Sequence, residues 1–148
     1  MDRIRPFIAE FVGTALFLFL GSTGASQGEG ILAISTSFGI GLAIAIYVAA
    51  PISGGHLNPA VTISMMASKN LPVVDGFGYI VSQVVGAIAG SAIGYGVLGE
   101  EFGGSLAMQG NFGAGQGLVA EIVGTFILVT IVFKYVSIHI PILHKTHS

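Results

Sequence analysis

The sequence predicts an all-α integral membrane protein with about four transmembrane helices and one re-entrant half-helix. Apolar residues make up 53% of the chain and charged residues 8%, with a mean hydropathy of +0.88. Soluble domains carry about a quarter charged residues, so this composition excludes a soluble domain. The uncharged run from Ile31 to Ser68 is too long for one membrane crossing and too short for two. It therefore predicts one crossing followed by a segment that enters the membrane and returns.

Four apolar segments are long enough to cross the hydrocarbon core, which takes about 20 helical residues. They are expected at about residues 6–25, 31–50, 75–100 and 117–133. Pro51 is expected to end the second crossing, because proline lacks the N–H that continues a helix. Gly28-Glu29-Gly30 predicts a tight turn, and the Gly-rich stretch from Glu100 to Gln116 predicts a longer loop. The third crossing carries Gly at every fourth position from Gly86 to Gly94, which predicts close packing against a neighbouring helix.

The re-entrant segment is predicted at Ser53-Gly54-Gly55-His56-Leu57-Asn58-Pro59-Ala60. Asn is a favoured N-cap and Pro a favoured first helical residue, so a half-helix is expected from about Pro59 to Ala67. At a rise of about 1.5 Å per residue it would be about 14 Å long, roughly half the membrane. Irregular backbone at that depth is tolerated only where it is packed in protein or lines a water-filled cavity. The segment is therefore the first candidate for a functional site.

Charge predicts the orientation. With four crossings, all the basic residues fall on one side of the membrane: Arg3, Arg5, Lys69, Lys134 and Lys145. The acidic residues Glu29, Glu100 and Glu101 fall on the other. By the positive-inside rule both chain ends are cytoplasmic, in a multi-pass protein of the cell membrane. The loop around Asn58 must then dip in from the cytoplasm, since a full crossing would place Lys69 among the acidic residues.

An internal repeat relates the first and fourth crossings. Ala9-Glu10-Phe11-Val12-Gly13-Thr14 and Ala120-Glu121-Ile122-Val123-Gly124-Thr125 agree at five of six positions, at an offset of 111. Three crossings separate the two starts, so the second copy begins on the opposite side, as in inverted-topology repeats. We expect a first repeat over about residues 6–100, the start of a second over about 115–133, and a divergent cytoplasmic tail over 134–148.

These features together resemble the aquaporin and glycerol-facilitator family, the major intrinsic proteins, over about residues 6–133. The pieces that carry the resemblance are the two repeat copies, the block from Ser53 to Thr62, and Tyr79-Ile80-Val81-Ser82-Gln83-Val84-Val85-Gly86-Ala87. The resemblance implies six crossings and two half-helices that meet at the bilayer centre, usually in tetramers with one pore per subunit. From Lys134 the sequence departs from the family pattern, so we expect an incomplete inverted repeat. A truncated or frameshifted gene would explain it, and the alternative is a genuine half-size protein.

Asn58 is the main candidate for a pore residue. Its neutral amide can donate to a passing water, and it stands at the half-helix N-terminus, where partial positive charge opposes cations. The alternative is an ordinary N-cap in a loop. Pro59 and Ala60 are structural in either interpretation, and the resemblance places them where the two half-helices meet.

The residues before Asn58 are candidates for the pore wall. Gly54, Gly55, His56 and Leu57 would present backbone carbonyl oxygens to the pore. His56 is either a pore-lining or loop-fixing polar group, or a satisfied packing histidine. No second ligand lies near it in the sequence, so no metal site is expected.

Glu10 and Glu121 are carboxylates inside apolar helices, and such residues default to functional hypotheses. The resemblance implies that each accepts hydrogen bonds from a re-entrant loop and holds the loop carbonyls toward the pore. The alternative for Glu10 is a proton relay in a coupled transporter. Gln83 is expected to hydrogen-bond within the bundle, with a role in a solvated pore as the alternative.

Phe38 lies near the outer end of the second crossing. The resemblance places an aromatic residue of water-selective members there, on the outer constriction. A Phe that faces lipid or the helix core is the alternative.

The functional hypothesis is a channel for passive flow of water, with small neutral solutes such as glycerol possible in the same class of pore. The alternatives are a non-conducting product or interaction partner of full-length channels, an antiparallel dimeric channel, and a proton-coupled transporter. No enzyme activity or cofactor is expected. With a net charge of −2 and no basic patch, nucleic acid is not an expected partner. The expected partners are water or a small solute, the lipid bilayer and further copies of the chain.

Overall fold

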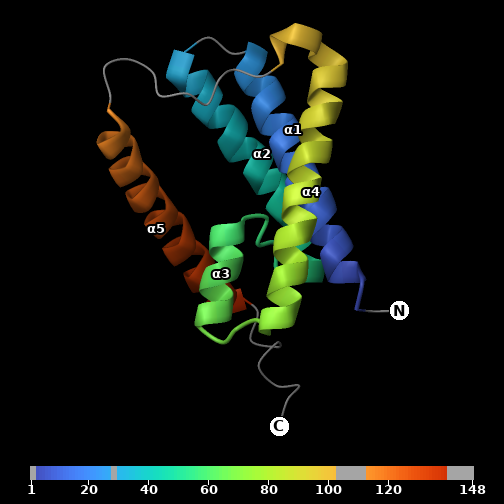
Figure 1. The fold of residues 1–148 in the computed structure, drawn as a ribbon, viewed down its shortest axis with the longest axis vertical. Helices are drawn as coiled ribbons and strands as arrows, with labels where there is room; N and C mark the ends of the chain where they lie inside the picture. Colours follow the sequence, from blue (N-terminus) through green and yellow to red (C-terminus); the bar gives the residue numbers. More distant parts are fainter. Residues whose placement is uncertain (1–2, 28–29, 103–112, 140–148) are drawn as a thin grey trace.

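The computed structural model describes residues 3–27, 30–102 and 113–139, and this part of the chain consists of helices joined by short turns and one irregular loop at 54–58. The elements are α1 (Arg5–Gln27), α2 (Gly30–Ser53), α3 (Pro59–Ala67), α4 (Val73–Leu98), the 3-10 turn η1 (Gly99–Glu101) and α5 (Ala114–His139) (Figure 1). Four of the described helices, α1, α2, α4 and α5, are long and apolar enough to cross a membrane. The predicted all-α membrane fold is therefore confirmed.

Helix α1 lies at the centre of the bundle and packs against α2 on one side and α4 on the other. The contact with α4 is made at Gly86 and Gly90, which lie against the backbone carbonyl oxygens of Phe11 and Ala15. A Cβ atom at either glycine would overlap those oxygens, so only glycine allows this approach. The predicted close packing along the third crossing is thus present for these two glycines.

The half-helix α3 begins and ends where the sequence predicts, at Pro59 and Ala67. It runs beside α4, and the lower part of α5 lies against its other side (Figure 1). Helix α5 is otherwise uncovered by the described residues, and none of its membrane-spanning window is buried. The start of α1 and the end of α5 lie toward the same end of the bundle (Figure 1), as four crossings require.

Two helix ends differ from the sequence prediction. Helix α2 continues through Pro51 to Ser53, because a proline in the last turn removes a single donor and the next turn still closes through Gly54 N to Ala50 O at 3.0 Å. The helix stops only where Gly54 and Gly55 take positive φ angles of 89° and 64°. Helix α5 runs on past Phe133 to His139, since no helix-breaking residue intervenes before Pro141.

Some predictions fall on residues outside the described ranges. These are most of the turn at 28–30, the centre of the loop at 100–116 and the end of the tail at 134–148. The division of the chain into repeats and tail remains a prediction.

Replacing Gly90 by Ala tests the packing of α1 on α4. The added Cβ would overlap the carbonyl oxygen of Ala15, and overpacking of this kind costs about 1–3 kcal/mol. Gly96→Ala in the same helix is the matched control, because the space around Gly96 is open. Thermal unfolding in detergent should show a lower Tm for Gly90→Ala and an unchanged or higher Tm for Gly96→Ala. Equal Tm values would contradict the proposed close contact.

Candidate functional site

The loop between α2 and α3 reverses the chain within five residues. Gly54 and Gly55 enter the left-handed region, which glycine adopts without steric cost. Leu57 also has a positive φ of 50°, which costs a residue with a side chain about 1–2 kcal/mol. A conformation of this kind persists only where surrounding contacts hold it.

The side chain of Leu57 provides one of those contacts. It is 3% exposed and packs in the core with Ala9, Ala45 and Ala49. Gly13 leaves the space that it occupies, since a Cβ there would lie 2.5 Å from Leu57 Cδ2. The loop is therefore anchored between α1 and α2 by an apolar side chain. The sequence predicts only a carbonyl role for Leu57. The sequence feature that indicates space for its side chain is Gly13, three positions after Glu10.

The carboxylate of Glu10 provides the polar contact. Its side chain is fully buried, and its two oxygens accept four hydrogen bonds. The donors are Ser53 Oγ at 2.6 Å, His56 N at 2.9 Å, Leu57 N at 2.7 Å and Gln83 Nε2 at 2.8 Å. Hydrogen bonds to an ionised acceptor are about twice as strong as neutral ones. Glu10 thus binds the end of α2, the loop and α4 at one point.

The hydrogen bonds of residues 54–57 orient the backbone groups of the loop. Gly54 N donates to Ala50 O, Gly55 N donates to Ser53 Oγ at 3.1 Å, and the next two amides donate to Glu10. All four N–H groups of residues 54–57 are therefore used inside the protein. The carbonyl oxygens of the same four residues accept no hydrogen bond from any residue in the described ranges. These four oxygens are therefore the backbone groups of the loop that the described residues leave without a donor.

Asn58 forms the N-cap of α3. Its backbone is extended, with φ −153° and ψ 127°, and its Oδ1 accepts from Ala60 N at 2.7 Å. This bond fixes the orientation of the carboxamide. The Nδ2 group makes no hydrogen bond to the described part of the chain, and the residue is half-buried. Asn58 therefore offers a donor directly after the four acceptors. Pro59 is exposed and Ala60 half-buried at the helix start.

A second set of polar contacts joins the loop to α3 and α4. Thr62 Oγ1 lies 3.1 Å from His56 Nδ1, 2.9 Å from Gln83 Nε2 and 3.2 Å from Asn58 O. Tyr79 donates its hydroxyl to Ser53 O at 2.9 Å, and its ring meets the His56 ring edge-on at 5.1 Å. His56 is 9% exposed and is held on both sides.

Two predicted site residues lie away from the loop. The Phe38 ring is half-buried against Gly21 of α1 and meets Phe17 edge-on at 6.0 Å. Glu121 is exposed on α5 and makes no hydrogen bond or ion pair to a described residue. The structure brings Gly54, Gly55, His56, Asn58 and Glu10 together, and leaves Phe38 and Glu121 outside the cluster.

Thr62 and Tyr79 were not predicted as part of the site. Tyr79 lies one helical turn before Gln83, so both project from one face of α4. The block from Tyr79 to Ala87 contributes to the family resemblance, but it does not indicate which residue Tyr79 contacts. Thr62 reads as an ordinary helical residue, since only the fold brings it to His56.

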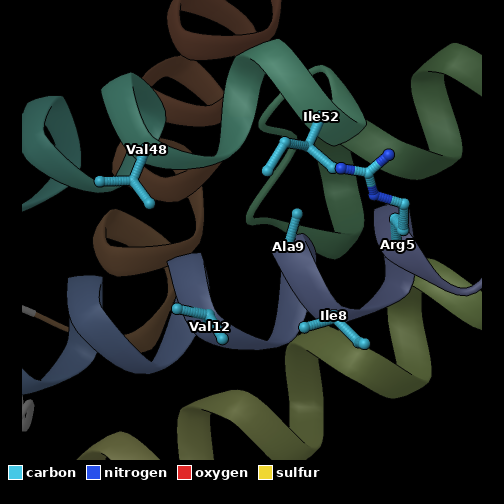
Figure 2. A pocket seen from close by; sticks show the side chains of 6 residues that line it. All are labelled: Arg5, Ile8, Ala9, Val12, Val48 and Ile52. Carbon is cyan, nitrogen blue, oxygen red and sulfur yellow. The ribbon is translucent and has the colours of Figure 1, made fainter.

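A shallow apolar groove lies elsewhere, between α1 and α2. It has a volume of about 330 Å³ and is lined by Arg5, Ile8, Ala9, Val12, Val48 and Ile52 (Figure 2). Ile8, Val12, Val48 and Ile52 are about half exposed, which is expected of a lipid-facing surface. The groove contains none of the loop residues. Among the described residues no group of three His, Cys, Asp or Glu side chains could hold a metal ion.

Comparison with known proteins found matches to one family. The family described as Major intrinsic protein matches residues 1–139. Aquaporin PIP2-5 of Oryza sativa subsp. japonica is 37% identical, over 88% of this chain and 53% of the relative. Aquaporin PIP2-7 of Arabidopsis thaliana is 36% identical, over 94% and 57%. The solved aquaglyceroporin from Plasmodium falciparum matches with a TM-score of 0.61 and 30% identity, over 64% of this chain and 42% of that one. The chain spans about half the length of the curated relatives it matches.

Replacing Glu10 by Gln tests the polar anchor. The new amide nitrogen would face N–H donors, so at least one buried bond is lost, and we expect a loss of about 3 kcal/mol in stability. Glu121→Gln is the matched control, because Glu121 is exposed and should change stability by less than about 0.5 kcal/mol. Unfolding curves of both variants in the same detergent measure the difference. A Glu10→Gln variant as stable as Glu121→Gln would refute the anchor.

Proposed function

This chain belongs to the major intrinsic protein family, and we propose on that basis that it forms one side of a membrane channel through which water flows passively. The observation that supports the proposal best is the orientation of the backbone groups in the loop. The amides of His56 and Leu57 donate to Glu10, while four carbonyl oxygens and Asn58 Nδ2 make no hydrogen bond to a described residue. Water can both donate to the carbonyls and accept from Asn58, so it matches this sequence of groups.

Selection against cations would follow from the half-helix. The N-terminus of α3 carries partial positive charge, and the neutral Asn58 amide adds a donor at the same place. A cation loses hydration there and gains no compensating negative group, whereas a neutral molecule meets no such barrier. Small neutral solutes such as glycerol belong to the same class. Phe38, as an aromatic group near the outer end of α2, would favour water over a larger solute.

The closed pore would require more protein than the described residues provide. The face of α1 that carries Glu10 and Gly13 is covered by the loop. The corresponding face of α5, with Glu121 and Gly124, is exposed in the described part of the chain. We infer that a second re-entrant segment covers this face in the conducting unit. Assembly into tetramers and cytoplasmic chain ends belong to the same proposal. The uncovered face also favours a second candidate, a non-conducting chain that binds full-length channels.

The environment of Glu10 argues against a proton-coupled transporter. A relay carboxylate must exchange a proton with a mobile donor, and four internal donors already occupy the two oxygens of Glu10. Its buried position between α1, α2 and α4 also separates it from bulk water. Support of the loop is the function that these contacts favour.

Stopped-flow shrinkage of liposomes that contain the full chain tests the channel. Asn58→Asp removes the donor and adds negative charge at the helix N-terminus, so we expect water permeability to fall several-fold and cation leakage to appear. Asn70→Asp makes the same chemical change in the exposed turn after α3 and should leave permeability unchanged.

Permeability above the lipid background that is lost in Asn58→Asp would support the channel. Permeability that is the same in both variants would contradict the role of Asn58. No permeability in any preparation would reject conduction by this chain alone and favour the non-conducting candidate. Flux driven by a pH gradient and abolished in Glu10→Gln would replace the proposal with the transporter.

A further inference from the structure

The tautomer of His56 follows from the hydrogen bonds around Thr62. Three groups surround Thr62 Oγ1: Gln83 Nε2 at 2.9 Å, His56 Nδ1 at 3.1 Å and Asn58 O at 3.2 Å. Thr62 is fully buried, so its hydroxyl must use these partners and not water. A hydroxyl has one hydrogen and two lone pairs, so the three contacts can all be satisfied in one arrangement only.

Gln83 must donate to Thr62. Its amide faces Glu10 Oε2 at 2.8 Å, and a carboxylate oxygen accepts but cannot donate. The NH₂ group therefore points to Glu10, and the same NH₂ group reaches Thr62. The opposite orientation would place Gln83 Oε1 against the carboxylate. The observed orientation leaves one acceptor unsatisfied: Gln83 Oε1 is buried and has no hydrogen-bond partner among the described residues.

The remaining proton of Thr62 then goes to Asn58 O, which cannot donate. If His56 carries its hydrogen on Nδ1, it donates to the second lone pair of Thr62 and all three contacts become hydrogen bonds. If the hydrogen is on Nε2, Thr62 has one proton for two acceptors. Either His56 Nδ1 then loses its partner in a buried site, or Thr62 gives up its bond to Asn58 O, which still accepts from Thr62 N at 3.0 Å. The Tyr79 ring, at 5.1 Å from the His56 ring, packs against it and supports the ring orientation that this bond requires.

We propose that the neutral His56 ring is held as the Nδ1–H tautomer by Thr62 and offers the Nε2 lone pair as an acceptor at the surface of the loop. Nε2 has no hydrogen-bond partner in the described part of the chain. It is also absent from the atoms there that are both buried and unpaired, so Nε2 keeps some solvent accessibility although His56 as a whole is only 9% exposed. His56 would then add a side-chain acceptor to the four carbonyl oxygens, two residues before the donor of Asn58.

Water in the channel would accordingly meet acceptors along the loop and a donor at its end. A histidine with Nε2–H would place a donor among the acceptors and reverse the preferred water orientation at that point. This consequence rests on the proposed function, whereas the tautomer itself does not. Thr62 acts here as a positioning residue, because it sets the proton position on His56 without facing the loop surface.

Solid-state NMR of the full chain, labelled with ¹⁵N- and ¹³C-histidine in lipid bilayers at neutral pH, reads the tautomer directly. The His56 signals are identified by their loss in His56→Gln. Correlations from Cγ and Cδ2 show which ring nitrogen carries the hydrogen. We expect Nδ1 protonated and Nε2 unprotonated in the wild type and in Thr62→Ser, which keeps the hydroxyl.

Thr62→Val has nearly the same shape and no hydroxyl, so the Nε2–H form should become substantially populated. A wild-type ring with Nε2–H, or a ring protonated on both nitrogens, would overturn the proposal. An unchanged Nδ1–H population in Thr62→Val would overturn the role of Thr62. If Thr62→Val does not fold, the wild-type and Thr62→Ser spectra still decide the tautomer. Liposomes that show no water permeability would reject the channel and leave this spectroscopic result unaffected.

Discussion

The buried carboxylate of Glu10 is the interaction on which the rest of the site depends. Removing an ionised carboxylate from water costs several kcal/mol, and the structure compensates that cost with four donors from three segments of the chain. Two of the four are backbone amides of the loop. Because those amides turn toward Glu10, the loop must turn its carbonyl groups the other way. The polarity of the candidate pore surface is therefore set by a residue that does not face the pore.

The backbone strain at Leu57 is offset by the burial of its side chain. Its left-handed backbone is needed to bring two successive amides to the carboxylate, at a cost of about 1–2 kcal/mol. Burying the leucine side chain beside Gly13 contributes about 1.5–3 kcal/mol, which offsets that cost. Glu10 and Gly13 lie three residues apart on α1, so one helix face supplies both the polar and the apolar contact. The same pair recurs in α5, where the described residues leave it uncovered.

The parts of the fold that depend on local chemistry could be predicted from the sequence. The start of α3 followed from the Asn58 N-cap and Pro59, and the crossings followed from composition and length. The end of α2 was misplaced because Pro51 is a weaker stop than two glycines that leave the helical region. Long-range contacts do not follow from local chemistry. The bonds from the loop to Glu10, 46 positions away at His56 N, were expected only from the family resemblance, and no neighbouring residue indicates the left-handed backbone of Leu57. The contact of Phe38 with Gly21 likewise depends on how two helices meet.

Amide hydrogen exchange of the full chain in lipid bilayers tests the central claim most directly. If Glu10 holds the loop, the amides of His56 and Leu57 should exchange as slowly as those in the core of α1. Their exchange should accelerate by at least tenfold in Glu10→Gln, while the amides of α1 itself change little. Rapid exchange of His56 and Leu57 in the wild type, or slow exchange that is unaffected by Glu10→Gln, would contradict the account.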